Sequence, residues 1–360
     1  MVFGGSLHAP AAPAETQAPP SESPAATAPA ETAASLVTPE PTPEPTPQTF
    51  TISFIGDITP DSVPFYRGSS VAYQNVVTAD NLGYVFEKTI QYFEDDDFTM
   101  ANFECALTNN TQAEDKNFTF RAPPEYAGIL TEGSVEFVTL GNNHVLDYGE
   151  QGYADTKAAL DGIGIGYAGR DEHTVYETAS GLKIGVYAVS FPDRTSQITE
   201  GITALKEAGA EFIIAAIHWG DEGSYDVNSK QLEWGHAAVD AGADVVYGSH
   251  PHTLQPVEVY NGRYIFYSMG NWSFGGNTNP SDKDTAIARL EVTRDADGTC
   301  SVTDVRLIPC ASSGVANGNN YQPVPYEEGG AEYERAISKL EGTFTGANLT
   351  IPYDYGYNEY

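Results

Sequence analysis

Short apolar runs alternate with amphipathic stretches from residue 50 to residue 247, a pattern typical of strands joined by helices. Six apolar runs predict buried strands, at residues 50–55, 97–103, 136–140, 183–190, 212–217 and 244–247. Apolar residues at helical spacing predict four helices, at residues 82–93, 153–163, 200–208 and 231–241. Because helix-linked strands build sheets with helices on their faces, this part of the chain predicts an α/β fold.

Beyond residue 252 the pattern changes to successive strands. Four of them are predicted, at residues 256–260, 263–268, 285–294 and 301–308, followed by one helix at residues 331–340. Asn261-Gly262 and Asp297-Gly298 are dipeptides that favour tight hairpin turns. The two halves together predict two packed sheets with helices outside them.

The first 48 residues consist mainly of Pro, Ala, Thr, Glu and Ser. They cannot bury enough apolar surface to fold, so residues 1–48 are predicted to be a disordered linker. No run approaches the 18 apolar residues that a membrane span needs, and the start of the chain has no signal-peptide pattern. A Pro/Thr/Glu-rich spacer is typical of a tether, however. We therefore expect an extracellular domain tethered to the cell surface, with the signal or anchor not present in this chain.

The charge of the chain limits its partners. It has 50 Asp and Glu against 17 Lys and Arg, a net charge of −33. Nucleic-acid binding relies on neutralising phosphates with Lys and Arg, so we expect no nucleic-acid partner. An acidic polymer as substrate would need a locally basic groove or bridging cations.

Three cysteines are too few for a disulfide-built scaffold. Cys300 and Cys310 flank a strand-like run and could pair in a hairpin. The alternative, that they and Cys105 are buried thiols, stays open at this point.

Polar side chains that can bind metals follow several predicted strands. They are Asp57, Glu104, His144, His218, His250 and His252. Each has a structural alternative: Asp57 could cap a turn, Glu104 could form a salt bridge, and His218 could be a core histidine. His250-Pro251-His252 is the strongest element, because two imidazoles two residues apart in an extended segment project to the same side. Ligands gather at the carboxyl ends of strands in open α/β sheets, so the set predicts a metal centre there.

The ligand types narrow the choice of metal. Imidazole, carboxylate and amide groups without a thiolate suit Mn, Fe or Zn better than Ca or Mg. Six candidates exceed the needs of one tetrahedral ion with an open position. They suit two divalent ions about 3.5–4 Å apart.

The motifs that contain these residues resemble a known family, the CapA capsule-synthesis proteins of bacterial poly-γ-glutamate biosynthesis, a branch of the calcineurin-like metallophosphoesterase superfamily. The resemblance covers about residues 50–275 and rests on Gly56-Asp57, Asn102-Phe103-Glu104, Asn142-Asn143-His144, Asp147-Tyr148-Gly149, His218-Trp219-Gly220-Asp221-Glu222, Gly248-Ser249-His250-Pro251-His252, Gln255-Pro256 and Tyr267-Ser268-Met269-Gly270-Asn271. It implies a four-layer αββα sandwich of the metallo-dependent phosphatase type over residues 49–312. Residues 313–360 would then be a C-terminal extension that packs on the domain or trails from it.

The resemblance also implies roles for single residues. Asp57 and His252 would hold one ion, and Asn143, His218 and His250 the other, with Glu104 in the place of the bridging carboxylate. His144 would contact phosphate or donate a proton, oriented by Asp147, and Arg121 would bind an anionic substrate unless it forms a surface salt bridge. The superfamily usually has a histidine where this chain has Thr59, which implies a weaker first site.

Two functions follow from this set. The first is a metal-dependent, phosphoesterase-like hydrolase in capsule or exopolymer biosynthesis, acting on an anionic polymer or a phosphoester. The second is a non-catalytic surface component of a membrane polymer synthase or transport complex that binds metal or polymer. A carbohydrate- or wall-binding module is a third hypothesis. The linker is compatible with it, but the motifs argue against it.

Overall fold

The computed structural model describes residues 46–350, and the predicted linker lies outside the described residues apart from its last three positions. The described residues belong to one compact unit built around two β-sheets. The first sheet contains, in spatial order, β16 (Val324–Pro325), β15 (Cys300–Ala311), β14 (Asp284–Arg294), β1 (Gln48–Thr59), β2 (Phe98–Phe103), β5 (Phe137–Thr139) and β6 (Gly166–Ala168), and β13 (Asn271–Phe274) also pairs with β1. The second contains β11 (Val257–Tyr260), β12 (Arg263–Phe266), β10 (Val245–Ser249), β9 (Phe212–His218), β8 (Lys183–Ser190) and β7 (Glu172–Glu177).

The helices and two further strands are short or lie outside the sheets. They are α1 (Tyr73–Val76), α2 (Gly128–Glu132), α3 (Gly149–Ile163), α4 (Thr195–Glu207), α5 (Ser229–Ala241), α6 (Ala331–Leu340), the 3₁₀ turns η1 (Leu82–Val85), η2 (Ile90–Tyr92) and η3 (Pro124–Ala127), and the pair β3 (Ala106–Leu107) and β4 (Arg121–Ala122). Among the described residues, no helix is long and apolar enough to cross a membrane.

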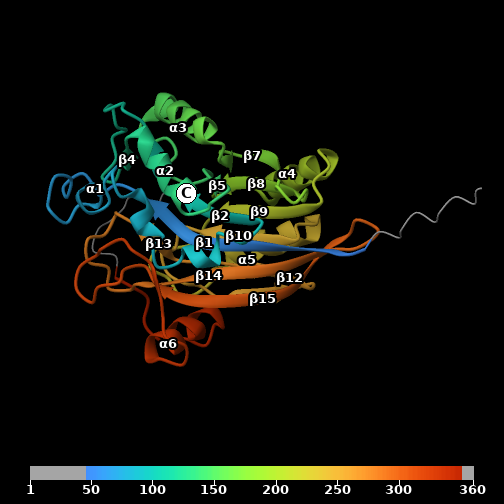
Figure 1. Ribbon diagram of the computed structural model, residues 1–360. Coiled ribbons are helices and arrows are strands. Elements are labelled where there is room, and N and C mark those ends of the chain that lie inside the picture. Colours follow the sequence, from blue (N-terminus) through green and yellow to red (C-terminus); the bar gives the residue numbers. More distant parts are fainter. Residues whose placement is uncertain (1–45, 351–360) are drawn as a thin grey trace, which may run out of the picture. The chain divides into compact units, whose positions relative to one another are not determined.

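Three buried apolar clusters divide the fold into four layers. The cluster between the sheets includes Phe54 of β1, Phe98 of β2 and Ile214 of β9. A second covers the outer face of the first sheet beneath α2 and α3, and a third joins the outer face of the second sheet to α4 and α5. This arrangement confirms the predicted α/β sandwich; Figure 1 shows α4 beside β7–β9, and α6 against β14 and β15.

Strand β1 is central to the first sheet and leads directly to the site. It runs parallel to β2 and antiparallel to β14, with its ladder interrupted between Phe54 and Asp57. Tyr247 of the second sheet reaches across this interruption, because its hydroxyl donates to the Ile55 carbonyl at 2.7 Å and accepts from the Asn102 amide at 3.0 Å. One side chain therefore fixes the two sheets to each other next to Asp57.

One predicted helix was wrong, and the open question of a Cys300–Cys310 disulfide is answered. Residues 82–93 form the separate turns η1 and η2 rather than one α-helix, although Val85, Phe86 and Phe93 are buried as the spacing predicts. Cys300 and Cys310 stand at opposite ends of β15 and are free thiols, as is Cys105. Ten residues of extended strand separate their backbones by about 33 Å, far beyond the reach of a disulfide.

A half-buried carboxylate at the amino end of β5 leads to a prediction about stability. Glu136 accepts a hydrogen bond from the Thr99 amide at 2.7 Å, and burial raises the pKa of Glu136 to about 7. The folded state therefore holds this proton more tightly than the unfolded state, and stability falls as the pH rises from 4.5 to 7.

Glu136→Gln keeps an acceptor for Thr99 and removes the ionisation. At pH 8 we expect the free energy of unfolding of this variant to exceed that of the wild type by roughly 1–2 kcal/mol. This is less than the full pKa shift would give, because Glu136 is partly solvated. The difference should vanish near pH 4.5, as urea unfolding at both pH values would measure. A difference that does not change with pH would contradict the assignment.

Candidate metal centre

The candidate ligands come from the carboxyl ends of strands in both sheets. In the first sheet, Asp57 of β1 is in register with Asn102 of β2, and Glu104 follows two residues later. In the second sheet, His218 at the end of β9 is in register with Ser249 of β10, which leads into His250. Parallel neighbours end at the same edge, so each sheet delivers its ligands to one place.

A close approach of backbones positions Asp57. The Asp57 amide donates to the Gly270 carbonyl at 2.9 Å. A Cβ at Gly56 would lie 2.0 Å from that same carbonyl oxygen, so only glycine allows the contact. The contact brings the segment that contains Asn271 next to β1.

The first group of ligands consists of Asp57, Glu104 and His252, whose ligand atoms all lie within 4.8 Å of one another. His252 Nδ1 lies 3.1 Å from Asp57 Oδ2 and 2.9 Å from Asn271 Oδ1. The Asn102 amide group donates to Asp57 Oδ1 at 2.8 Å and to Glu104 Oε1 at 3.0 Å. Asn102 thus fixes both carboxylates in orientation, as supporting residues do around metal sites.

The second group shares Glu104 with the first. His218 Nε2 lies 3.3 Å from Glu104 Oε1 and 3.0 Å from Asn143 Oδ1. His218 Nδ1 contacts Ser249 Oγ at 2.9 Å, which leaves Nε2 directed at the centre. The His250 ring lies beside the His218 ring, with the centroids 4.7 Å apart. Glu104 therefore stands between the two groups, in the position that a bridging carboxylate requires.

The chemistry of these donors fits a divalent transition metal. Burial lowers the pKa of His218 and His250 well below the usual value, so both rings are neutral, as metal ligands must be. Burial and the neighbouring Asp57 raise the pKa of Glu104. Glu104 Oε2 is fully buried without a hydrogen-bond partner. A buried carboxylate oxygen of this kind is costly unless a cation compensates it.

The segment of His250 and His252 is not extended, contrary to the expectation. Both residues have positive φ angles, 98° for His250 and 57° for His252. The two rings still lie close, with centroids 5.9 Å apart. Backbone conformations of this type cost energy in non-glycine residues and concentrate at functional sites.

His144 and Asp147 form a second, smaller arrangement beside the ligands. His144 Nδ1 lies 2.8 Å from Asp147 Oδ2, and the same carboxylate accepts from the Phe120 amide and from Lys116 Nζ, each at 2.8 Å. Burial alone would raise the pKa of Asp147, but His144 and Lys116 lower it below the usual value. The ionised Asp147 only accepts, so His144 Nδ1 donates to it.

The structure therefore brings together the predicted residues Asp57, Glu104, Asn143, His218, His250 and His252, with His144 and Asp147 next to them. Arg121 is placed elsewhere, with its guanidinium over the Tyr148 ring at 5.6 Å. Its role as a substrate-binding residue stays a prediction.

Comparison with known proteins assigns the chain to a family. Residues 51–275 match the family model described as bacterial capsule synthesis protein PGA_cap, a match that contains every ligand from Asp57 to His252. The chain belongs to the PGA_cap family. The PGA biosynthesis protein CapA of Bacillus subtilis is 30% identical over 281 residues, which cover 71% of each chain. The capsule biosynthesis protein CapA of Bacillus anthracis is 28% identical over 271 residues, covering 67% of this chain and 64% of that protein.

Two solved structures are more distantly similar. The NAD nucleotidase of Haemophilus influenzae has a TM-score of 0.45 at 14% identity, covering 82% of this chain and 56% of that one. The purple acid phosphatase PPD1 of yellow lupin has a TM-score of 0.35 at 10% identity, covering 86% and 58%. At these values the likeness carries no conclusion about chemistry.

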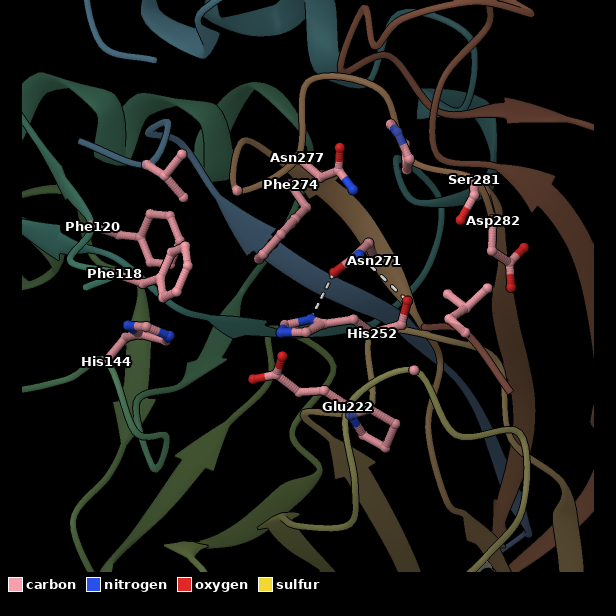
Figure 2. A pocket seen from close by; sticks show the side chains of 16 residues that line it. Phe118, Phe120, His144, Glu222, His252, Asn271, Phe274, Asn277, Ser281 and Asp282 are labelled. Carbon is pink, nitrogen blue, oxygen red and sulfur yellow. Dashed lines mark hydrogen bonds between the residues drawn. The ribbon is translucent and has the colours of Figure 1, made fainter. Parts of the chain in front are cut away.

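Sequence reasoning missed one residue of this PGA_cap chain as a possible ligand. Glu222, in the loop after β9, has its carboxylate within 4.8 Å of the ligand atoms of His250 and His252. It is half-buried and forms no hydrogen bond with another described residue. Figure 2 shows it facing the same pocket as His144 and His252. A single acidic residue in a loop has no periodicity, so only its proximity to His218 in the sequence could have drawn attention to it.

Glu222→Gln is expected to weaken Mn²⁺ binding by at least about tenfold, because the variant removes a carboxylate from the edge of the ligand set. Isothermal titration with Mn²⁺ would measure the change. Asp221→Asn is the matched control, since Asp221 is the adjacent, exposed carboxylate and its side chain accepts a hydrogen bond from Asn228 at 2.9 Å. Equal weakening in both variants would show a general loss of negative charge instead of a lost ligand.

Proposed function

We propose that this chain is a metal-dependent hydrolase of phosphoesters that works in the synthesis of poly-γ-glutamate or a related exopolymer. The observation that carries the proposal is Glu104. Its carboxylate is fully buried, lies between two groups of imidazole and oxygen ligands, and has one oxygen without a hydrogen-bond partner. Burial alone would lower the pKa of His252, but Glu104 and Asp57 raise it to about 10, and its ring lies 4.0 Å from this oxygen. An ion bound at the centre would compensate the carboxylate in place of that charge.

Asp57, Glu104 and His252 would hold one ion, and Glu104, Asn143, His218 and His250 the other. Mn, Fe and Zn are the metals that this set of nitrogen and oxygen donors favours. Two such ions would polarise a bound phosphoryl group and supply hydroxide at neutral pH. Thr59 adds no ligand where the superfamily has a histidine, so we expect the first ion to bind more weakly than the second.

The residues of the chain itself would handle the proton. His144 Nε2, with Nδ1 held by Asp147, is the group that can give a proton to the leaving oxygen. Lys116 contacts both the Asp147 carboxylate and the Asn143 carbonyl, at 2.8 and 2.9 Å, and so ties this pair to the second group of ligands. The rings of Phe120 and Phe274 pack against His144 and His252 and limit the access of water.

The pathway, partners and location are part of the proposal. The Bacillus relatives are named for PGA and capsule biosynthesis, which supports a role in making an anionic polymer. A membrane synthase complex is the expected partner. The Pro-rich first 48 residues support a tether that presents the domain at the outer cell surface. Protease accessibility of the domain on intact cells would test the location.

Elemental analysis of the purified protein, together with hydrolysis assays on phosphomonoesters, phosphodiesters and γ-glutamyl amides, tests the function. We expect close to two transition-metal ions per chain and turnover of a phosphoester that EDTA abolishes. Bound metal without any turnover would favour the non-catalytic component of a synthase complex. Absence of stoichiometric metal would overturn the proposal.

A further inference from the structure

A pocket opens directly beside the candidate metal centre. We call it the aromatic pocket; its wall includes Phe118, Phe120 and Phe274, and it shares His144, Glu222 and His252 with the centre (Figure 2). A substrate whose reacting group is held by the ligands can place the neighbouring atoms in this pocket. Its lining therefore selects what the reacting group can be attached to.

The rings form a continuous wall next to the imidazoles. The Phe120 ring lies 4.7 Å from the His144 ring and 5.9 Å from the Phe274 ring, measured between centroids. The Phe274 ring lies 4.6 Å from the His252 ring. An apolar group bound there would contact aromatic surface on one side and stay within reach of the centre.

The pocket is small. Its volume of about 80 Å³ gives room for roughly six water molecules at 10–15 Å³ each. This is the space of one ring or short alkyl group and excludes a folded segment of polymer. Leu349 closes one side, because its amide donates to the Gly223 carbonyl at 2.9 Å and holds the C-terminal segment over the loop of Glu222.

The charges of the lining oppose an anionic substituent. Among the described residues that line the aromatic pocket, the acidic ones are Glu222 and Asp282, and none is Lys or Arg. Lys339 Nζ compensates Asp282, at 2.6 Å. A carboxylate placed in the pocket would meet the like charge of Glu222, and the groups of the lining that could offset it are the rings of His144 and His252, at the edge shared with the metal centre.

We propose that the aromatic pocket is a subsite for a small uncharged apolar group, such as an aryl or short alkyl group, bonded to the phosphoryl group of the substrate. This inference rests on the proposed function, since the phosphoryl group must bind at the metal centre. It also implies that the free carboxylates of an acidic polymer point away from this side of the centre.

Binding of phosphonates, which are not hydrolysed, tests the subsite separately from catalysis. Titration of the Mn²⁺-loaded full chain should give a dissociation constant about tenfold lower for phenylphosphonate than for methylphosphonate, the gain expected from burying the ring. 4-Carbamoylphenylphosphonate should bind about tenfold more tightly than 4-carboxyphenylphosphonate, which has nearly the same shape and an added charge.

Two variants identify the wall. Phe274→Ala should lose most of the preference for phenylphosphonate over methylphosphonate, measured as the ratio of the two dissociation constants within each variant, and Phe274→Leu should retain most of that ratio. Equal affinity of the wild type for phenyl- and methylphosphonate would overturn the subsite, even if phosphoesters are hydrolysed. Failure of both phosphonates to bind would overturn the proposed function and this inference with it.

Discussion

Glu104→Gln should abolish the binding of one metal ion, weaken the other, and lower phosphoester turnover by at least about 10³-fold. The reason is the position of Glu104 between the two groups of ligands, 3.3 Å from His218 Nε2 and 4.0 Å from His252 Nε2. A neutral amide cannot take the place of a carboxylate that serves both ions. Elemental analysis after dialysis against limiting Mn²⁺, with a matched kinetic assay, would measure both effects.

The same variant should not be less stable than the wild type in EDTA. The amide oxygen can still accept from Asn102, and the substitution removes a buried charge that lies close to Asp57. Loss of metal without loss of stability is the expected signature of a functional carboxylate. Glu136→Gln, a second buried carboxylate in the first sheet, serves as the control and should retain its metal. A large loss of stability in EDTA for Glu104→Gln would instead assign a structural role to Glu104.

His144→Asn is the second substitution with a large expected effect, and it should separate chemistry from metal binding. It removes the group that can protonate the leaving oxygen. General acid catalysis by such a group contributes about 10²–10⁴-fold in rate. The bound metal should stay unchanged, because His144 is held by Asp147, packs against Phe120 and is not one of the proposed ligands. Turnover and metal content measured on one preparation would show the difference.

The leaving group provides the control for this prediction. A substrate with a good leaving group, such as 4-nitrophenyl phosphate, needs little protonation and should lose much less rate than phenyl phosphate in His144→Asn. An equal loss on both substrates would contradict a proton-donating role. It would leave His144 as a residue that positions the phosphoryl group.

Most strands could be predicted from the sequence because their apolar runs are short, fully buried and bounded by turns. The prediction for residues 183–190 coincides with β8, and the helix predicted at residues 331–340 coincides with α6. Residues 82–93 could not be assigned in this way. Apolar positions three or four residues apart suit 3₁₀ turns as well as an α-helix, and packing decides between them.

The same distinction applies to the site: some of its residues could be predicted from local sequence pattern, and others depend on tertiary contacts. Residues that end strands could be predicted, because the edge where parallel strands end is a property of the fold. The rings of His250 and His252 lie close together as expected, but left-handed backbone rather than an extended segment directs them. Glu222 and the aromatic pocket depend on loops from distant parts of the chain, for which no local pattern exists.

The central place of β1 has a consequence for how the protein is made. Its antiparallel partner, β14, begins roughly 225 residues further along the chain. At a synthesis rate of about 5–20 residues per second, one edge of β1 waits some 10–50 s for that partner. An open edge of this length is a template for wrong strand pairing. We therefore expect the nascent chain to need shielding of β1, by a chaperone for example, until residues 284–294 have emerged.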